Sequence, residues 1–78
     1  MGKRYNLMLE RIKAGYDRQD LFAEKCNTSG ANISNIESGK RKGSYETWLS
    51  IQKVLNKTNA EMWDLYLIQE DKWKIKSK

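Results

Sequence analysis

The most distinctive chemical feature of this sequence is positive charge, part of which is concentrated in one short segment. Lys40, Arg41 and Lys42 are consecutive and follow Gly39, a residue type that favours turns. The whole chain carries 15 Lys and Arg residues against 10 Asp and Glu residues, so its formal net charge is +5. Because Lys and Arg bind phosphates through charge and hydrogen bonds, this balance favours a polyanionic partner.

Groups that could perform catalysis or bind a metal ion are scarce. The chain has no His, which is the commonest general base and metal ligand, and it has a single Cys. Cys26 alone can form neither an internal disulfide nor a zinc site. The sequence also lacks a nucleophile–base pair and a phosphate-binding glycine loop. We therefore expect a binding protein that uses no metal ion, cofactor or small-molecule ligand, and not an enzyme.

Length and composition indicate one small helical domain. The chain has 78 residues, of which 38% are hydrophobic and 32% are charged. That balance is too polar for a membrane protein and too apolar for a disordered chain, and no run of 18 apolar residues is present. The first ten residues lack the apolar stretch and cleavage site of a secretory signal. The absence of Pro and the spacing of Gly favour helices separated by short turns.

Helical periodicity predicts five short helices, in which apolar residues recur three and four positions apart. In chain order these residues are Tyr5, Met8, Leu9 and Ile12; Leu21, Phe22, Ala23 and Cys26; Ile33 and Ile36; Tyr45, Trp48, Ile51, Val54 and Leu55; and Met62, Trp63, Leu65, Tyr66, Leu67 and Ile68. The expected core contains Leu9, Ile12, Ile33, Ile36, Trp48, Ile51 and Leu55. Residues 72–78, KWKIKSK, alternate Lys with other residues, which suits a strand or a frayed basic helix end equally well.

Capping residues predict where these helices begin and end. Asp17 is a candidate N-cap for the second helix, with Asp20 at the third helical position as in a capping box. Tyr16 and Leu21 flank this start and could form a hydrophobic staple, and the helix then runs to about Cys26. The other predicted caps are Ser29, Ser44 and the Thr58–Glu61 capping box at helix starts, and Gly15, Asn27 and Gly39 at helix ends.

The stretch AEKCNTSGANISNIESGKR, residues 23–41, resembles the helix-turn-helix of the lambda-repressor-like Cro/repressor family, also called the xenobiotic-response-element family. The resemblance continues through residues 44–55. It depends on a combination of residues, namely Ala23, Ser29, Ile33, Ser34, Ile36, Glu37, Gly39, Lys40 and Arg41. The resemblance implies an all-α, compact bundle of five short helices, with a helix-turn-helix formed by helices 2 and 3. The DNA-binding domain is expected over residues 1–71, followed by a basic tail over residues 72–78.

The resemblance also implies which residues would meet DNA. In the family, the third helix enters the major groove with its N-terminal end toward the bases. The corresponding base-reading residues are Ser29, Gly30, Ala31, Asn32 and Asn35, of which Asn35 is expected to pair with an adenine edge. The corresponding phosphate-binding residues are Arg18, Gln19, Ser38, Lys40, Arg41 and Lys42. The alternative for both sets is a solvated helix and turn.

Further implied roles concern the interior and the fifth helix. The resemblance pairs Arg11 with Glu37 as a structural ion pair and makes Cys26 a small buried hydrophobe. The fifth helix is too apolar for a small monomer to bury completely, so we expect a dimer interface there. The candidate interface residues are Trp63, Tyr66, Leu67 and Trp73. The alternative is that Trp63 and Tyr66 close the core.

Taken together, the resemblance implies sequence-specific binding of double-stranded DNA by a homodimer on a palindromic operator. The expected role is a transcriptional repressor, in the cytoplasm at a bacterial nucleoid or in a phage-infected cell, with no membrane partner. Because the chain ends soon after the DNA-binding fold, we expect a concentration-driven switch of the phage, mobile-element or restriction–modification type. The alternative is a protein-interaction module of the same fold, such as an antitoxin or anti-regulator. Gly30 and Ala31 motivate it, because they replace polar residues at the base-reading surface.

Overall fold

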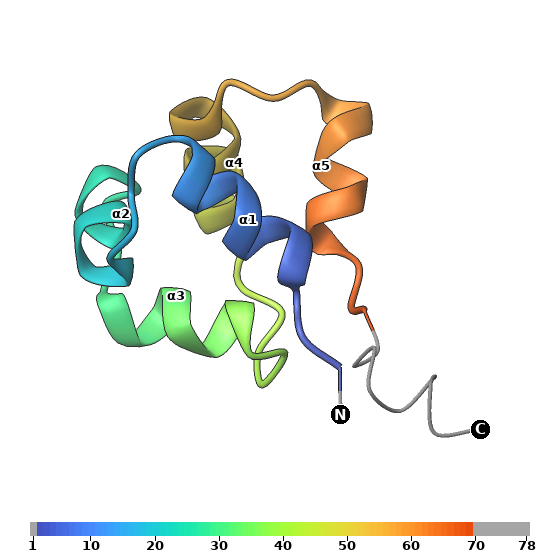
Figure 1. The fold of residues 1–78 in the computed structure, drawn as a ribbon, viewed down its shortest axis with the longest axis horizontal. Coiled ribbons are helices and arrows are strands. Elements are labelled where there is room, and N and C mark those ends of the chain that lie inside the picture. The colour runs from blue at the N-terminus through green and yellow to red at the C-terminus, as the bar shows by residue number, and fades with distance from the viewer. Residues whose placement is uncertain (1, 70–78) are drawn as a thin grey trace.

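Five short α-helices joined by turns make up the fold (Figure 1). This computed structural model describes residues 2–69, which form α1 (Tyr5–Lys13), α2 (Gln19–Lys25), α3 (Gly30–Glu37), α4 (Tyr45–Leu55) and α5 (Asn59–Tyr66). This part of the chain contains no strand, although Lys3 and Gln69 form an isolated antiparallel bridge between its two ends. The predicted all-α class and the five predicted helices are therefore confirmed. The predicted tail, residues 72–78 with Trp73, lies outside the described residues.

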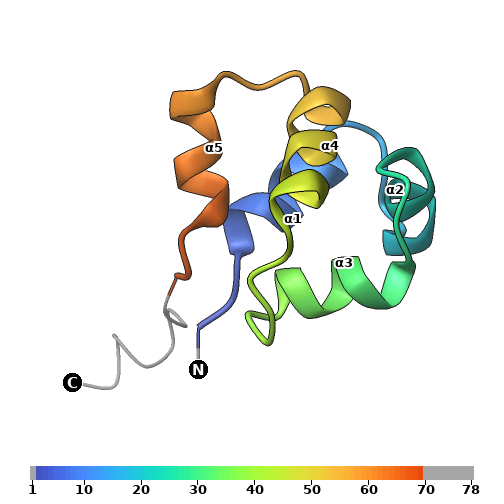
Figure 2. The same cartoon turned by 180° about the vertical axis from the view of Figure 1, so that it is seen from behind.

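The helices are arranged so that α3 forms one edge of the molecule. The most closely associated helices are α2 and α3, which are joined by a turn in which Asn27 has a φ of 57°. In both views, α2 lies at one end of α3, and the loop toward α4 lies at the other end (Figures 1 and 2). α1 and α4 lie between α2 and α5 in both views. One long side of α3 is therefore left uncovered by the other described helices.

Every helix contributes to a common hydrophobic core. Its buried members are Leu7, Phe22, Ala23, Cys26, Ile33, Ile36, Ile51, Leu55 and Leu65. Tyr16, Trp48, Val54 and Met62 are partly buried and pack against it. The predicted core positions in α3 and α4 are thus confirmed, with Trp48 at the margin of the core. Ala23, a small residue of α2, is 1% exposed, which fits the close association of α2 with α3.

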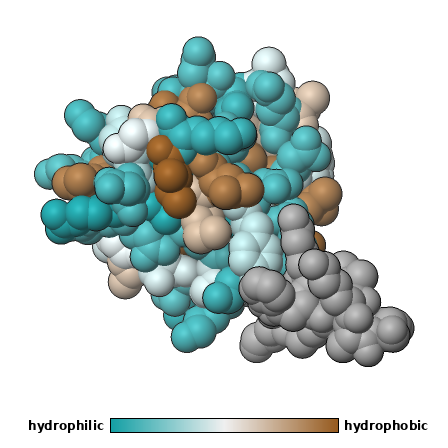
Figure 3. All heavy atoms as spheres, viewed as in Figure 1, coloured by the Kyte–Doolittle hydropathy of each residue, from teal (hydrophilic) through white to brown (hydrophobic). Residues whose placement is uncertain are grey.

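The predicted inner face of α1 was wrong. Leu9 and Ile12 are 50% and 46% exposed, whereas Leu7 and Arg11 are buried. Leu7 and Arg11 are four positions apart and so lie on one face of the helix. Arg11 turns inward because its guanidinium binds Glu37, and Leu9 then faces solvent. Hydrophobic side chains are accordingly visible at the surface over the region of α1 (Figure 3).

The predicted start of α2 was also wrong. The helix begins at Gln19, and its N-cap is Arg18, which makes no side-chain capping hydrogen bond. The Asp20 carboxylate binds the Arg18 guanidinium instead of completing a capping box. Leu21 is 42% exposed, and the Tyr16 ring lies against Phe22, with ring centroids 5.5 Å apart, so no staple forms.

The other predicted caps are present. The hydroxyl groups of Ser29, Ser44 and Thr58 each accept a hydrogen bond from the backbone N–H three residues later, and Glu61 completes the capping box of α5. The predicted helix ends at Gly15, Asn27 and Gly39 all have positive φ. These short-range signals correctly placed α3, α4 and α5 along the chain.

Candidate nucleic-acid interface

α3 has one face locked into the core and another that faces solvent. Ile33 and Ile36 are fully buried, and they hold the inner face against the other helices. On the outer side, Ala31 and Ser34 are exposed and Asn35 is half-buried. The helix is therefore fixed in rotation about its axis, with small and polar residues presented outward.

Two of the predicted base-reading side chains have structural hydrogen bonds. The Ser29 hydroxyl accepts from the backbone N–H of Asn32 at 3.1 Å, which caps α3. The Asn32 side chain donates through Nδ2 to the Thr28 hydroxyl at 2.8 Å. Gly30 lies close to Asp20, because a Cβ at this position would be 3.5 Å from the Asp20 Cα atom. The outer surface available to a partner is therefore centred on Ala31, Ser34 and Asn35.

Ser34 was not among the predicted site residues. It lies three positions after Ala31 and four after Gly30, so helical spacing alone places it on the same face. The three residues line a shallow concavity of about 470 Å³ between α3 and the start of α2. The other lining residues are Arg18, Gln19 and Asp20.

The cations Lys40, Arg41 and Lys42, here called the basic loop, are attached to the end of α3. The backbone N–H of Arg41 donates to the carbonyl of Asn35 at 3.2 Å. The Ser38 hydroxyl donates to the same carbonyl, also at 3.2 Å. All three basic side chains are exposed. The main-chain bond therefore holds the basic loop, with its three exposed side chains, at the C-terminal end of α3.

The predicted phosphate-binding residues of α2 are engaged within the protein. Gln19 donates through Nε2 to a Glu37 carboxylate oxygen at 2.9 Å, so its side chain turns inward. Arg18 binds the Asp20 carboxylate through two hydrogen bonds, of 2.6 and 3.1 Å. Both of these charged side chains are more than half exposed. Arg18 thus stays accessible to solvent, whereas the Gln19 amide is committed to Glu37.

The ion pair implied by the resemblance is present in the interior. Arg11 donates to both carboxylate oxygens of Glu37, at 2.7 and 3.3 Å, and the two side chains are 5% and 6% exposed. Arg11 also donates to the carbonyl of Tyr16 at 2.6 Å. With Gln19 as a further donor, the Glu37 carboxylate is fully engaged and does not face the outer surface of α3.

Arg4 is a second buried arginine, for which the sequence analysis assigned no role. It is 3% exposed, and burial lowers the pKa of its guanidinium. Arg4, Leu7 and Arg11 follow i, i+3, i+7 spacing and form one buried stripe at the start of the chain. That spacing was a usable signal, but two arginines on a stripe ordinarily indicate a solvated face.

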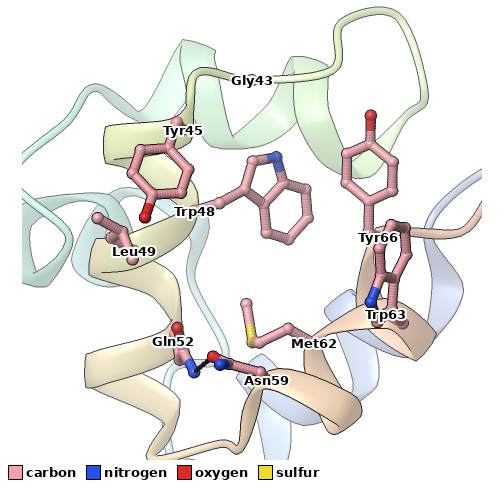
Figure 4. A pocket seen from close by; sticks show the side chains of 9 residues that line it. All are labelled: Gly43, Tyr45, Trp48, Leu49, Gln52, Asn59, Met62, Trp63 and Tyr66. Atoms are coloured by element: carbon pink, nitrogen blue, oxygen red, sulfur yellow. Dashed lines mark hydrogen bonds between the residues drawn. The ribbon is translucent and has the colours of Figure 1, made fainter.

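A groove lined by aromatic and other side chains separates α4 from α5 (Figure 4). It has a volume of about 530 Å³ and is lined by Gly43, Tyr45, Trp48, Leu49, Gln52, Asn59, Met62, Trp63 and Tyr66. Gln52 donates to the Asn59 side chain at 2.7 Å across one end. Of the predicted interface residues, Trp63 and Tyr66 line this aromatic groove, and Leu67 is 53% exposed. Trp73 lies outside the described residues.

The pKa values of Cys26 and Glu10 are shifted, each with a simple cause. Burial raises the pKa of the Cys26 thiol to about 11, which fits its position in the core. A hydrogen bond from Lys57, at 2.8 Å, lowers the pKa of the Glu10 carboxyl. Within residues 2–69 no group of three acidic, Cys or His side chains is placed to hold a metal ion. Nor is any helix of that range long and apolar enough to cross a membrane.

Comparisons with protein-family models, with curated proteins and with solved structures found no match. A functional assignment therefore depends on the residues themselves and on their geometry.

Proposed function

We propose that this protein binds double-stranded DNA sequence-specifically and regulates transcription, with α2 and α3 acting as a helix-turn-helix and α3 as the recognition helix. The observation that carries the proposal is the hydrogen bond between the Arg41 N–H and the Asn35 carbonyl. It holds a run of exposed cations at the C-terminal end of a helix whose inner face is locked into the core. Cations bind phosphates, and the adjacent helix face reads bases.

The dimensions and side chains of α3 suit the major groove. An α-helix with its side chains is about 10–12 Å in diameter, and the major groove of B-DNA is about 12 Å wide. The small side chains of Ala31 and Ser34 let the helix approach the base edges closely. Asn35 would then bond an adenine through its amide, and the Ala31 methyl would contact a thymine methyl.

The basic loop would hold the helix in place by binding phosphates. Such contacts set position and orientation but carry no sequence information. Arg18 would join them by exchanging the Asp20 carboxylate for a phosphate. An exposed ion pair contributes only about 0–1 kcal/mol to stability, so breaking the Arg18–Asp20 pair would cost little free energy.

Dimerisation would supply the second half of the contact. A two-fold dimer on a palindromic operator places its recognition helices about 34 Å apart, one turn of DNA. The exposed side chains of Trp63 in α5 and of Leu67, its C-cap, provide an apolar surface for self-association. A dimer bound across a promoter would repress transcription by blocking polymerase.

Selection of bound duplexes from a random pool, followed by titration of the selected duplex, tests the proposal. Asn35→Ala is expected to weaken binding by about 1–3 kcal/mol and to relax the preference at one base pair. Lys40→Ala should weaken all duplexes alike and reduce the slope of log affinity against log salt by about 1. Lys53→Ala, which removes an exposed cation from α4, is the matched control. No binding of any duplex at low salt would refute the proposal.

A second candidate function is a protein-interaction module that keeps the fold but does not read bases. It is favoured by the outer face of α3, where Gly30 and Ala31 offer no hydrogen-bonding side chain and Asn32 is bound to Thr28. The same titration separates the two candidates. An interaction module would show no selected sequence and no effect of Asn35→Ala.

A further inference from the structure

The Arg4 guanidinium joins three parts of the chain that are distant in sequence. Its Nη1 donates to the Ile36 carbonyl at 2.7 Å and to the Arg41 carbonyl at 3.0 Å. Its Nε donates to the Tyr66 carbonyl at 2.7 Å. One side chain therefore links the end of α3, the basic loop and the end of α5. All three of these acceptors are main-chain carbonyls. The hydrogen bonds from Arg4 therefore hold the backbone of each segment in place.

Aromatic rings extend this link to a second carbonyl of the basic loop. The Arg4 guanidinium lies over the rings of Tyr66 and Trp48, 5.0 and 5.7 Å from their centroids. The Trp48 indole donates through Nε1 to the Lys42 carbonyl at 2.6 Å. The carbonyls of Arg41 and Lys42 are thus held on the protein side of the loop, while the basic side chains are exposed to solvent.

Main-chain hydrogen bonds also hold the backbone at Arg4 and at the residue before it. Its N–H donates to the carbonyl of Glu37 at 2.8 Å. The preceding residue, Lys3, exchanges two main-chain hydrogen bonds with Gln69, of 2.9 and 2.8 Å. A side chain at Gly2 would collide with Ile68, so this segment is closely enclosed. Arg4 is therefore anchored firmly enough to position the groups that it binds.

We propose that Arg4 is a positioning residue that sets the location of the basic loop relative to the outer face of α3. It thereby determines how the loop cations and Asn35 meet the same duplex. The DNA part of this inference rests on the proposed function, but the positioning itself does not. The guanidinium is suited to the role because its planar, fixed array of donors reaches several carbonyls at once, which a lysine ammonium cannot reproduce.

Amide hydrogen exchange tests the positioning without DNA. Arg4→Gln should speed exchange at the Arg41 amide by about tenfold or more, because the loop loses its inner anchor. The Trp48 indole N–H resonance should shift at the same time. The Ile33 amide, bonded to the Ser29 carbonyl inside α3, should stay protected and show that the fold persists. Unchanged exchange at Arg41 in folded protein would overturn the inference.

Arg11→Lys is the matched control, since it alters the buried arginine of α1, whose hydrogen bonds go to Glu37 and Tyr16 and not to the loop. It should lower stability yet leave Arg41 exchange and the Trp48 indole signal unchanged. Equal loosening of the loop by Arg11→Lys would contradict a specific role for Arg4. If Arg4→Gln does not fold, the same measurement is made on Arg4→Lys. Faster exchange at the Arg41 amide is expected in that variant, and unchanged exchange would contradict the inference.

Titration with DNA then connects position to binding. Arg4→Gln should weaken duplex binding by about tenfold to a hundredfold and reduce the salt slope, although it removes no exposed cation. If the natural protein binds no duplex, the proposed function fails while the exchange result still judges the positioning role. If exchange at Arg41 quickens but affinity is unchanged, Arg4 positions the loop without consequence for DNA, and that part of the inference is wrong.

Discussion

The side of the molecule formed by α2, α3 and the basic loop differs from the side formed by α4 and α5 in what holds it together and in what it exposes. On the first side, Arg4, Arg11 and Glu37 form buried polar links, and the surface carries cations and small polar residues. On the second side, aromatic rings meet edge to face, as Trp48 and Tyr66 do at 5.4 Å, and the groove between the helices is open.

This contrast shows how a small chain can support two kinds of surface. Directional hydrogen bonds fix the first side in one geometry, as the proposed binding of base edges and phosphates would require. Aromatic packing leaves the second side apolar and partly exposed, with Trp63 65% exposed. Exposed aromatic side chains of this kind are typical of protein–protein interfaces. We expect substitutions on the two sides to have different consequences.

The largest expected effect comes from removing a buried link on the first side. Arg11→Met should lower the free energy of unfolding by about 3–5 kcal/mol, because the Glu37 carboxylate would remain buried without its cation. Thermal unfolding followed by circular dichroism measures it, and a loss of that size corresponds to a melting temperature lower by about 12 °C or more. Lys13→Met, which removes an exposed cation from the same helix, should change stability by less than about 0.5 kcal/mol.

The double variant Arg11→Met/Glu37→Met sharpens the test. Replacing both partners with apolar residues removes the stranded carboxylate, so much of the lost stability should return. An unchanged melting temperature in Arg11→Met would mean that the first side does not depend on its polar links.

These buried links also mark the limit of prediction from sequence. The caps at Ser29 and Thr58 depend on hydrogen bonds between residues three positions apart, so the local sequence was enough to predict them. The inner face of α1 depends instead on Arg11 reaching Glu37, 26 positions away. Hydrophobic periodicity predicted that Leu9, rather than Arg11, lies on the buried face of α1. That prediction was wrong because periodicity takes no account of tertiary hydrogen bonds.

The candidate site divides in the same way. The exposed basic loop follows from composition, and the outward position of Ala31 follows from the resemblance. The inward turn of Gln19 and the three carbonyls held by Arg4 do not, since each requires knowing which segments meet in space. The resemblance supplied the Arg11–Glu37 pair, but no comparable pattern singled out Arg4.

The next largest effect is expected on the second side. Trp63→Ala should weaken self-association by about 2 kcal/mol, roughly 30-fold in the dimer dissociation constant, because exposed Trp residues often dominate interfaces. Stability of the monomer should change little, since Trp63 is 65% exposed and meets the Tyr66 ring edge to face at 6.0 Å. Sedimentation equilibrium measures the dissociation constant. Leu9→Ala, at an exposed apolar residue of α1, serves as the control.

A monomeric natural protein at all concentrations, or a larger effect of Leu9→Ala, would contradict this prediction. Either result would break the contrast, because the aromatic groove would then not be a surface for a second copy of the chain.

The smallest expected effect concerns Asp20, a carboxylate beside the outer face of α3. Asp20 neutralises Arg18 at the concavity shared with Ala31 and Ser34. Asp20→Asn should therefore raise duplex affinity by roughly two- to fivefold and steepen the salt slope by about 1, as the freed Arg18 gains a phosphate. Fluorescence anisotropy across salt concentrations measures both. Glu24→Gln removes an exposed carboxylate elsewhere on α2, and equal behaviour of the two variants would show that Arg18 does not face the backbone of DNA.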